Sequence, residues 1–122
     1  MPPSALAGDP WSDLFPLPAK GSENHDAYEE MLRLIAYDIA DPKRLRLVAE
    51  ACADYGVRVQ KSLFECWLEQ DRFDQLWQRL EALLNKEEDC IAAYVLDRGA
   101  ARQRRCLGRE MVFSQPRMRY VL

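Results

Sequence analysis

Histidine is almost absent from this chain of 122 residues, and its cysteines never form a C-x-x-C pair. The single histidine, His25, lies within the first thirty residues. Catalytic triads that use histidine and two-histidine metal sites are therefore excluded, and the usual zinc pattern cannot be built. Any chemistry must come from carboxylates, hydroxyls and arginines. We expect the cysteines to be small buried side chains in a reducing compartment: Cys52, Cys66, Cys90 and Cys106.

Long apolar runs are absent as well. No stretch of about 18 apolar residues is present that could span a membrane. The first thirty residues hold five of the seven prolines and lack the hydrophobic segment of a secretory signal, so we expect a cytoplasmic protein. With 48% hydrophobic and 30% charged residues, the chain has the composition of a soluble globular protein. Its length allows one domain with a modest core.

The net charge of −3 conceals an asymmetry along the chain. Residues 1–30 contain six acids and one lysine, whereas residues 31–122 contain 16 basic and 14 acidic residues. Within the second part, residues 98–119 hold seven arginines and a single acid, Glu110. That segment is either an anion-facing surface or a solvated arginine-rich tail.

The first thirty residues are expected to be a flexible, acidic, proline-rich leader. Trp11, Leu14 and Phe15 would share one face if this stretch became helical on binding, which makes them a candidate docking motif. Met31 could instead be the functional start, because the folded pattern begins there.

Asp38 ends an apolar run that begins at Met31 and predicts a buried strand over residues 31–38. A buried, unpaired carboxylate is unfavourable by several kcal/mol or shifts its pKa. Asp38 therefore needs a metal, a cation or an exposed rim. The alternative is an exposed aspartate that ends the strand and caps the turn.

Two helices and three further extended segments follow. Asp41 caps a helix with Pro42 at its first position, and Gly56 stops that helix. Residues 57–68 predict one bulged strand or a tight hairpin. Asp71 is expected to cap a second helix, and residues 89–97 return as a strand. The apolar stripe of the second helix comprises Phe73, Leu76, Trp77, Leu80 and Leu83.

The order strand, helix, two strands, helix, strand predicts an α+β, ferredoxin-like βαββαβ sandwich over residues 31–97. With both helices on one face, the other face of the sheet is left bare, and a second copy of the chain would cover it to give a homodimer through the sheets. Residues 98–122 form an arginine-rich extension with short strands expected at 111–113 and 120–122. These strands could extend the sheet, cross to a partner subunit or offer an edge to another protein.

Two segments resemble one protein family. They are Leu32-Arg-Leu-Ile-Ala-Tyr-Asp-Ile-Ala-Asp41, followed by arginines at 44 and 46, and Tyr55-Gly-Val-Arg-Val-Gln-Lys-Ser-Leu-Phe-Glu65. With the later strand at 89–96, they are similar to the small CRISPR-associated endonuclease family "Cas-two", the partner of the spacer integrase. The resemblance covers about residues 31–97.

The resemblance implies a homodimer in which Asp38 of each chain faces the other, holds a divalent cation, usually Mg²⁺, and supports phosphodiester cleavage. It further implies that the dimer bridges subunits of the spacer integrase and supports double-stranded DNA, with single-stranded RNA as another substrate. Residues at or near the family's site, which would bind nucleic acid or shape it, are Tyr37, Arg44, Arg46, Arg58, Ser62 and Phe64.

Each of these residues also has a purely structural interpretation. Phe64 could belong to the core, as could Trp67, and Tyr37 could pack at the dimer seam. Ser62 could be a strand hydroxyl that satisfies a neighbour. Arg58 could pair with Glu65 rather than with a phosphate.

Three functions remain open at this point. The first is a scaffold that holds duplex DNA and bridges integrase subunits, with or without nuclease activity. The second is a Mg²⁺-dependent endonuclease centred on Asp38, including a free-standing toxin-like endoribonuclease. The third, a regulatory domain that binds a small ligand, has no glycine-rich loop to support it.

Overall fold

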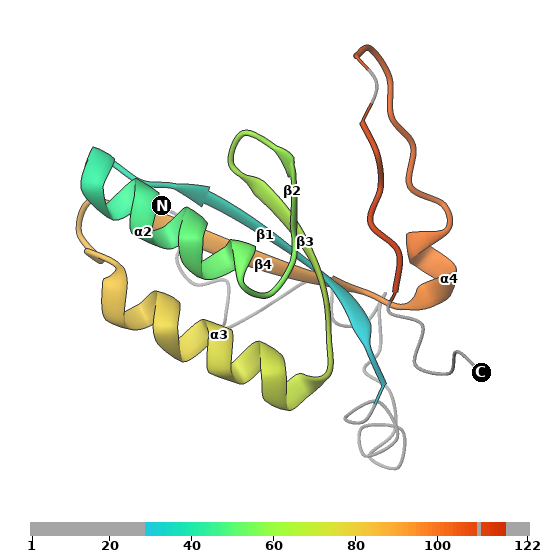
Figure 1. The fold of residues 1–122 in the computed structure, drawn as a ribbon, viewed down its shortest axis with the longest axis horizontal. Helices are drawn as coiled ribbons and strands as arrows, with labels where there is room; N and C mark the ends of the chain where they lie inside the picture. Colours follow the sequence, from blue (N-terminus) through green and yellow to red (C-terminus); the bar gives the residue numbers. More distant parts are fainter. Residues whose placement is uncertain (1–28, 110, 117–122) are drawn as a thin grey trace, which may run out of the picture.

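The computed structural model describes residues 29–109 and 111–116, and its elements from residue 31 to residue 96 follow the predicted order of strand, helix, two strands, helix and strand (Figure 1). Residues 1–28 of the leader, with Trp11, Leu14 and Phe15, lie outside the described residues, as does the strand expected at 120–122. The strands are β1 (Met31–Asp38), β2 (Val57–Gln60), β3 (Leu63–Leu68) and β4 (Cys90–Leu96). The helices are α2 (Pro42–Ala53), α3 (Gln70–Leu83) and α4 (Arg98–Ala101).

The strands form one antiparallel sheet in the order β2-β3-β1-β4. Helices α2 and α3 pack against each other and cover the same face of this sheet (Figure 1). The predicted α+β, ferredoxin-like arrangement is therefore confirmed. Because β1 is central and runs between β3 and β4, its last residue, Asp38, reaches the end of the sheet next to the start of α2.

The start of α2 follows the sequence prediction. The Asp41 carboxylate accepts a hydrogen bond of 2.9 Å from the backbone N–H of Arg44, and Pro42 occupies the first turn. Gly56 has a different role from the one predicted, because its backbone is not left-handed. A Cβ at Gly56 would lie 2.4 Å from Cys66 Sγ and 2.4 Å from the Glu65 carbonyl oxygen, so glycine is needed for close packing on β3.

Residues 57–68 form a hairpin, and the bulge that the sequence offered as the alternative is present within it. Lys61 and Ser62 make the turn, and the register of β2 against β3 shifts between Arg58 and Gln60.

The predicted cap of α3 was wrong by two positions. Glu69 precedes the helix without a side-chain capping bond, and Asp71 lies in the first turn, where a carboxylate favours the positive end of the helix dipole. The predicted apolar stripe faces the sheet: Leu76 and Leu80 are buried, and Phe73, Trp77 and Leu83 pack against the core.

The core lies between the sheet and the two long helices. Alternate residues of β1 and β3 contribute to it, together with the inner faces of α2 and α3. Its buried members are Ile35, Tyr37, Val48, Ala51, Cys52, Phe64, Cys66, Leu68, Leu76 and Leu80.

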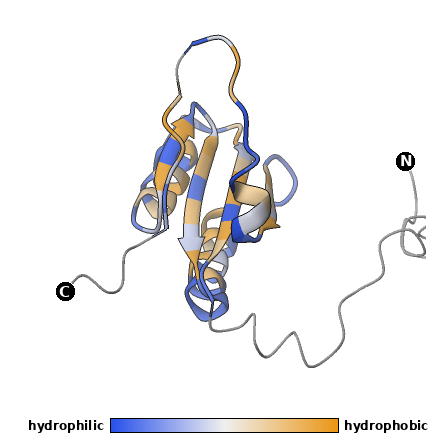
Figure 2. Ribbon diagram, turned by 90° about the vertical axis from the view of Figure 1, so that its right-hand side faces the viewer, coloured by the Kyte–Doolittle hydropathy of each residue, from blue (hydrophilic) through white to orange (hydrophobic). Residues whose placement is uncertain are grey.

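The opposite face of the sheet is only partly covered. Helix α4, which the sequence did not predict, packs against β1 and β4, and Ala101 is buried there. Residues 102–109 and 111–116, here called the C-terminal arm, then form a projecting loop with both hydrophobic and hydrophilic residues (Figure 2). The short strand predicted at 111–113 is not formed, because those residues have no strand partner among the described residues. None of the helices in the described ranges is long and apolar enough to cross a membrane.

Candidate metal and nucleic-acid site

Asp38 is the exposed last residue of β1 and lies opposite Cys90 in the register with β4. The sequence allowed three environments for this carboxylate: a metal, a cation or an exposed rim. In the structure, the carboxylate lies at an exposed rim. A carboxylate at such a rim is solvated and needs no buried partner. Within residues 29–109 and 111–116, no group of three or more histidine, cysteine or acidic side chains could hold a metal ion. The described part of one chain therefore exposes the Asp38 carboxylate without two further histidine, cysteine or acidic side chains placed to share a metal ion with it.

Tyr37, Ser62 and Phe64 lie together at the same end of the sheet. The Tyr37 backbone N–H donates to the Ser62 carbonyl oxygen at 3.1 Å, and the Tyr37 hydroxyl makes a long contact of 3.5 Å with the Lys61 carbonyl oxygen. The Tyr37 and Phe64 rings stack with centroids 6.2 Å apart, and both residues are buried. These two aromatic residues shape the end of the sheet from inside the core, and Ser62 belongs to the turn rather than to a strand.

Arg58 stands on β2 with its guanidinium 5.5 Å from the centre of the Phe64 ring. The alternative pairing of Arg58 with Glu65 was wrong, because Glu65 binds Arg104 at 2.6 Å. Arg58 is exposed, so its charge faces solvent above an aromatic ring.

The other two predicted arginines differ in environment. Arg46 is exposed on α2 and makes only a 4.0 Å ion pair with Glu50. Arg44 binds Asp89 at 2.9 Å and Glu88 at 2.9 Å. Hydrogen bonds to these carboxylates raise the pKa of Arg44 and lower the pKa of Asp89 to about 2. Arg44 is thus engaged within the chain, whereas Arg46 remains available to an anion.

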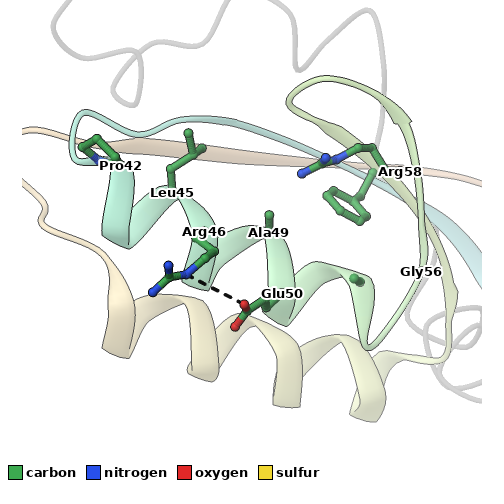
Figure 3. A pocket seen from close by; sticks show the side chains of 9 residues that line it. Pro42, Leu45, Arg46, Ala49, Glu50, Gly56 and Arg58 are labelled. Carbon is green, nitrogen blue, oxygen red and sulfur yellow. Dashed lines mark ion pairs between the residues drawn. The ribbon is translucent and has the colours of Figure 1, made fainter.

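An open groove of about 570 Å³ separates α2 from the β2–β3 hairpin (Figure 3). Arg58 lies on one side of it, and Arg46 turns towards Glu50 on the other (Figure 3). Its other lining residues are Pro42, Leu45, Ala49, Ala53 and Gly56. Asp38 does not line this groove, so the structure separates the arginine-bearing groove from the carboxylate at the rim.

The sequence analysis missed two clusters that fix the surroundings of these residues. Asp89 joins the loop after Asp38 to α2 and to the loop that follows α3. The second cluster joins β3 to the C-terminal arm: the buried Glu65 carboxylate accepts bonds from Arg104, from the Ser114 backbone N–H and from the Ser114 hydroxyl. Both clusters connect residues about 40 to 50 positions apart in the sequence, a separation that local patterns do not encode.

The open face of the sheet carries the remaining exposed apolar surface near Asp38. Leu34 lies opposite Tyr94, and Ala36 lies opposite Ala92, in the register of β1 with β4. Tyr94 is 62% exposed. On the C-terminal arm, Arg102, Arg105 and Arg109 are exposed, as are Leu107 and Val112.

The expectation for the cysteines was half right. Cys52 and Cys66 are buried, and burial raises the pKa of the Cys52 thiol to about 11 and that of Cys66 to about 12. Cys90 and Cys106 are exposed free thiols instead of core side chains. Cys90 is exposed because it starts β4 on the open face, opposite Asp38.

Comparison with known proteins gives a consistent result. Residues 31–104 match the family model described as CRISPR associated protein Cas2. The chain is 45% identical over 73 residues to the CRISPR-associated endoribonuclease Cas2 of Nitratidesulfovibrio vulgaris. The aligned region covers 56% of this chain and 72% of the relative.

Solved structures are similar as well. The crystal structure of Streptococcus pyogenes Cas2 is 38% identical with a TM-score of 0.59, covering 64% of this chain and 100% of that one. A chain from a partial Cas6-RT-Cas1–Cas2 complex is 27% identical with a TM-score of 0.57, covering 63% of this chain and 90% of that one.

Proposed function

The chain belongs to the CRISPR-associated protein Cas2 family, as its two sequence motifs indicated, and from this we propose how it works in CRISPR adaptation. It acts as a homodimer that bridges subunits of the spacer integrase and supports duplex DNA. The same dimer is a Mg²⁺-dependent endonuclease centred on Asp38. The observation that carries the nuclease proposal is the exposed Asp38 carboxylate at the end of β1, beside an incompletely covered sheet face.

The available ligands suit magnesium only when two chains combine. Mg²⁺ prefers oxygen ligands and keeps several waters, so one or two carboxylates with water and phosphate can complete its shell. Asp89 and Asp41 are engaged in hydrogen bonds within the chain, which leaves Asp38 as the carboxylate for this role. Asp38 of a second copy would supply the other protein ligand across a two-fold axis.

The proposed dimer uses the open face of the sheet. Leu34, Ala36, Ala92 and Tyr94 present apolar surface there on paired positions of β1 and β4, next to Asp38. Packing two such faces together would remove that surface from water and bring the two Asp38 residues towards each other.

Cleavage would draw on few protein groups. A bound Mg²⁺ ion would supply charge stabilisation at the phosphoryl oxygens or acidify a bound water. Asp38 would hold the cation, and Tyr37, Ser62 and Phe64 would keep the end of β1 in shape through the contacts described above. The described residues include no histidine, so water or another protein group near Asp38 would accept the proton, which favours slow turnover.

Nucleic-acid binding would rest on arginines that make phosphate contacts without reading sequence. Arg46 and Arg58 border the groove, and Arg102, Arg105 and Arg109 line the exposed part of the C-terminal arm. A protein that must accept many different spacers benefits from such sequence-independent contacts. Arg44 contributes by supporting the loop instead, since Asp89 and Glu88 already occupy its guanidinium.

The partner and substrate follow from the relatives. A similar chain occurs in a complex named for Cas1 and Cas2, which supports the integrase as partner. A relative is named an endoribonuclease, which supports RNA as an alternative substrate to duplex DNA. The second candidate function is a scaffold without cleavage, favoured because the described residues contain no group of three or more histidine, cysteine or acidic side chains that could hold a metal ion.

The test is cleavage of labelled RNA and labelled duplex DNA by the full chain, with Mg²⁺ or with EDTA. Wild type is expected to cleave only with Mg²⁺, and Asp38→Asn is expected to reduce cleavage to background because the amide is a poor cation ligand. Asp54→Asn is the matched control, since Asp54 pairs with Arg79 at the far end of α2.

Three results would contradict the nuclease proposal. Cleavage that persists in Asp38→Asn would assign the activity to another site or to a contaminant. Equal loss in Asp54→Asn would attribute the effect to general destabilisation. Duplex binding without cleavage by wild type would leave the scaffold as the function.

A further inference from the structure

The Asp89 carboxylate accepts four hydrogen bonds in the part of the chain that the structure describes. Asp89 lies between α3 and β4, and its side chain is fully shielded from solvent although the loop around it is exposed. Its Oδ1 accepts the Ala40 backbone N–H at 2.9 Å, and its Oδ2 accepts the Asn85 backbone N–H at 3.0 Å. The Arg44 guanidinium binds both oxygens, at 2.9 and 3.3 Å.

These contacts hold Asp38 from two directions along the chain. Ala40 is two residues after Asp38, so its bond to Asp89 fixes the loop that leaves β1. Cys90, the residue after Asp89, is the register partner of Asp38 in β4. Asp89 therefore fixes both the strand opposite Asp38 and the chain that follows it. Both carboxylate oxygens are occupied, so Asp89 is a support and not an additional cation ligand.

We propose that Asp89, together with Arg44, is the positioning residue of the Asp38 site: it fixes the loop after β1 so that the Asp38 carboxylate is held ready for the cation. This proposal rests on the proposed function, and it gives Arg44 a role other than phosphate binding. Groups that orient metal ligands commonly change metal affinity by 10- to 100-fold when they are removed. Hydrogen bonds from Arg44 lower the pKa of Asp89 to about 2, so the carboxylate is charged at neutral pH, as an ion pair with Arg44 requires.

The test compares full-length wild type with Asp89→Asn, Asp89→Ala, Arg44→Met and Asp38→Asn, the last of which identifies the Mn²⁺ binding that depends on Asp38. Asp54→Asn is again the control, because it also breaks a carboxylate–arginine pair. Asp54 follows the last residue of α2 and pairs with Arg79 on α3, whereas Arg44 lies near the start of α2. The two ends are roughly 18 Å apart along the 12-residue helix. Thermal unfolding is measured for every variant, so that loss of stability can be separated from loss of positioning.

Two readouts need no enzymatic activity. The first is the hydrogen-exchange rate of the Ala40 amide, which should increase in Asp89→Ala and remain unchanged in Asp54→Asn, since only the first variant removes its acceptor. The second is Mn²⁺-induced broadening of backbone signals next to Asp38. We expect Asp89→Asn and Arg44→Met to need about tenfold more Mn²⁺ than wild type or Asp54→Asn.

The outcomes separate the two proposals. If wild type binds Mn²⁺ through Asp38 and the Asp89 variants bind it equally well, the positioning role is overturned and the metal site stands. An unchanged Ala40 exchange rate in Asp89→Ala also overturns the positioning role. If wild type shows no Mn²⁺ binding that depends on Asp38, the proposed metal site is wrong and the positioning proposal fails with it. Weaker Mn²⁺ binding in proportion to lost thermal stability, shared by Asp54→Asn, would reduce Asp89 to a general structural role.

Discussion

Arg44 and Arg46 on α2 and Arg58 on β2 carry the same guanidinium group. Their roles differ because their neighbours differ. Arg44 is bound by two carboxylates, Arg46 has a loose partner one helical turn away, and Arg58 lies above an aromatic ring. The sequence could predict that all three are cationic and close to the motif. It could not assign Arg44 to Asp89, because that contact joins positions 45 residues apart.

The cysteines give a prediction at the same scale. Cys52 and Cys66 should resist alkylation by iodoacetamide at pH 8 in the folded protein, because both are buried and their thiol pKa values are raised to about 11 and 12. Cys106 should react readily, because it is exposed. Peptide mass mapping after timed labelling measures the rates.

Labelling in guanidinium chloride is the control, and there all sites should react at similar rates. Modification of Cys52 or Cys66 as fast as that of Cys106 in the native protein would contradict the packing of the core.

The elements divide into those whose start is encoded locally and those that depend on tertiary contacts. Asp41 and Pro42 predicted the start of α2 correctly, because capping uses atoms three residues apart. Asp71 was assigned the same role by the same reasoning, but α3 begins earlier and has no capping side chain. Helix α4 was not predicted, because a four-residue helix has too few positions to show periodicity.

Gly56 shows how an element can depend on close approach between neighbours. Gly56→Ala should destabilise the protein by about 1–3 kcal/mol or more, since the new methyl group would overlap the Glu65 carbonyl and the Cys66 side chain. Chemical denaturation monitored by circular dichroism measures this change.

Gly99→Ala is the matched control, because its new Cβ would meet nothing closer than 3.5 Å. Equal stability of the two variants would contradict the tight packing of the α2–β2 connection on β3.

At the scale of the whole molecule, the sheet has one face closed by α2 and α3 and one face closed only in part. The cluster of Glu65, Arg104 and Ser114 fixes the C-terminal arm over part of that second face. The rest of the face keeps partly or fully exposed side chains: Leu34, Ala36, Ala92 and Tyr94. The fold and its bare face could be predicted from the order in which strands and helices follow one another along the chain. The course of the arm could not, because it depends on the buried Glu65 network and not on local strand preference.

The central claim is that two Asp38 carboxylates from two chains form one site. The most direct measurement is Mg²⁺-dependent cleavage by wild type and Asp38→Asn mixed at a constant total concentration, after their subunits have been allowed to exchange. A shared site requires two wild-type subunits, so equal parts of each protein should retain about a quarter of the wild-type rate. A rate that falls in simple proportion to the wild-type fraction, to about half in that mixture, would contradict the shared site and place a complete site in each chain.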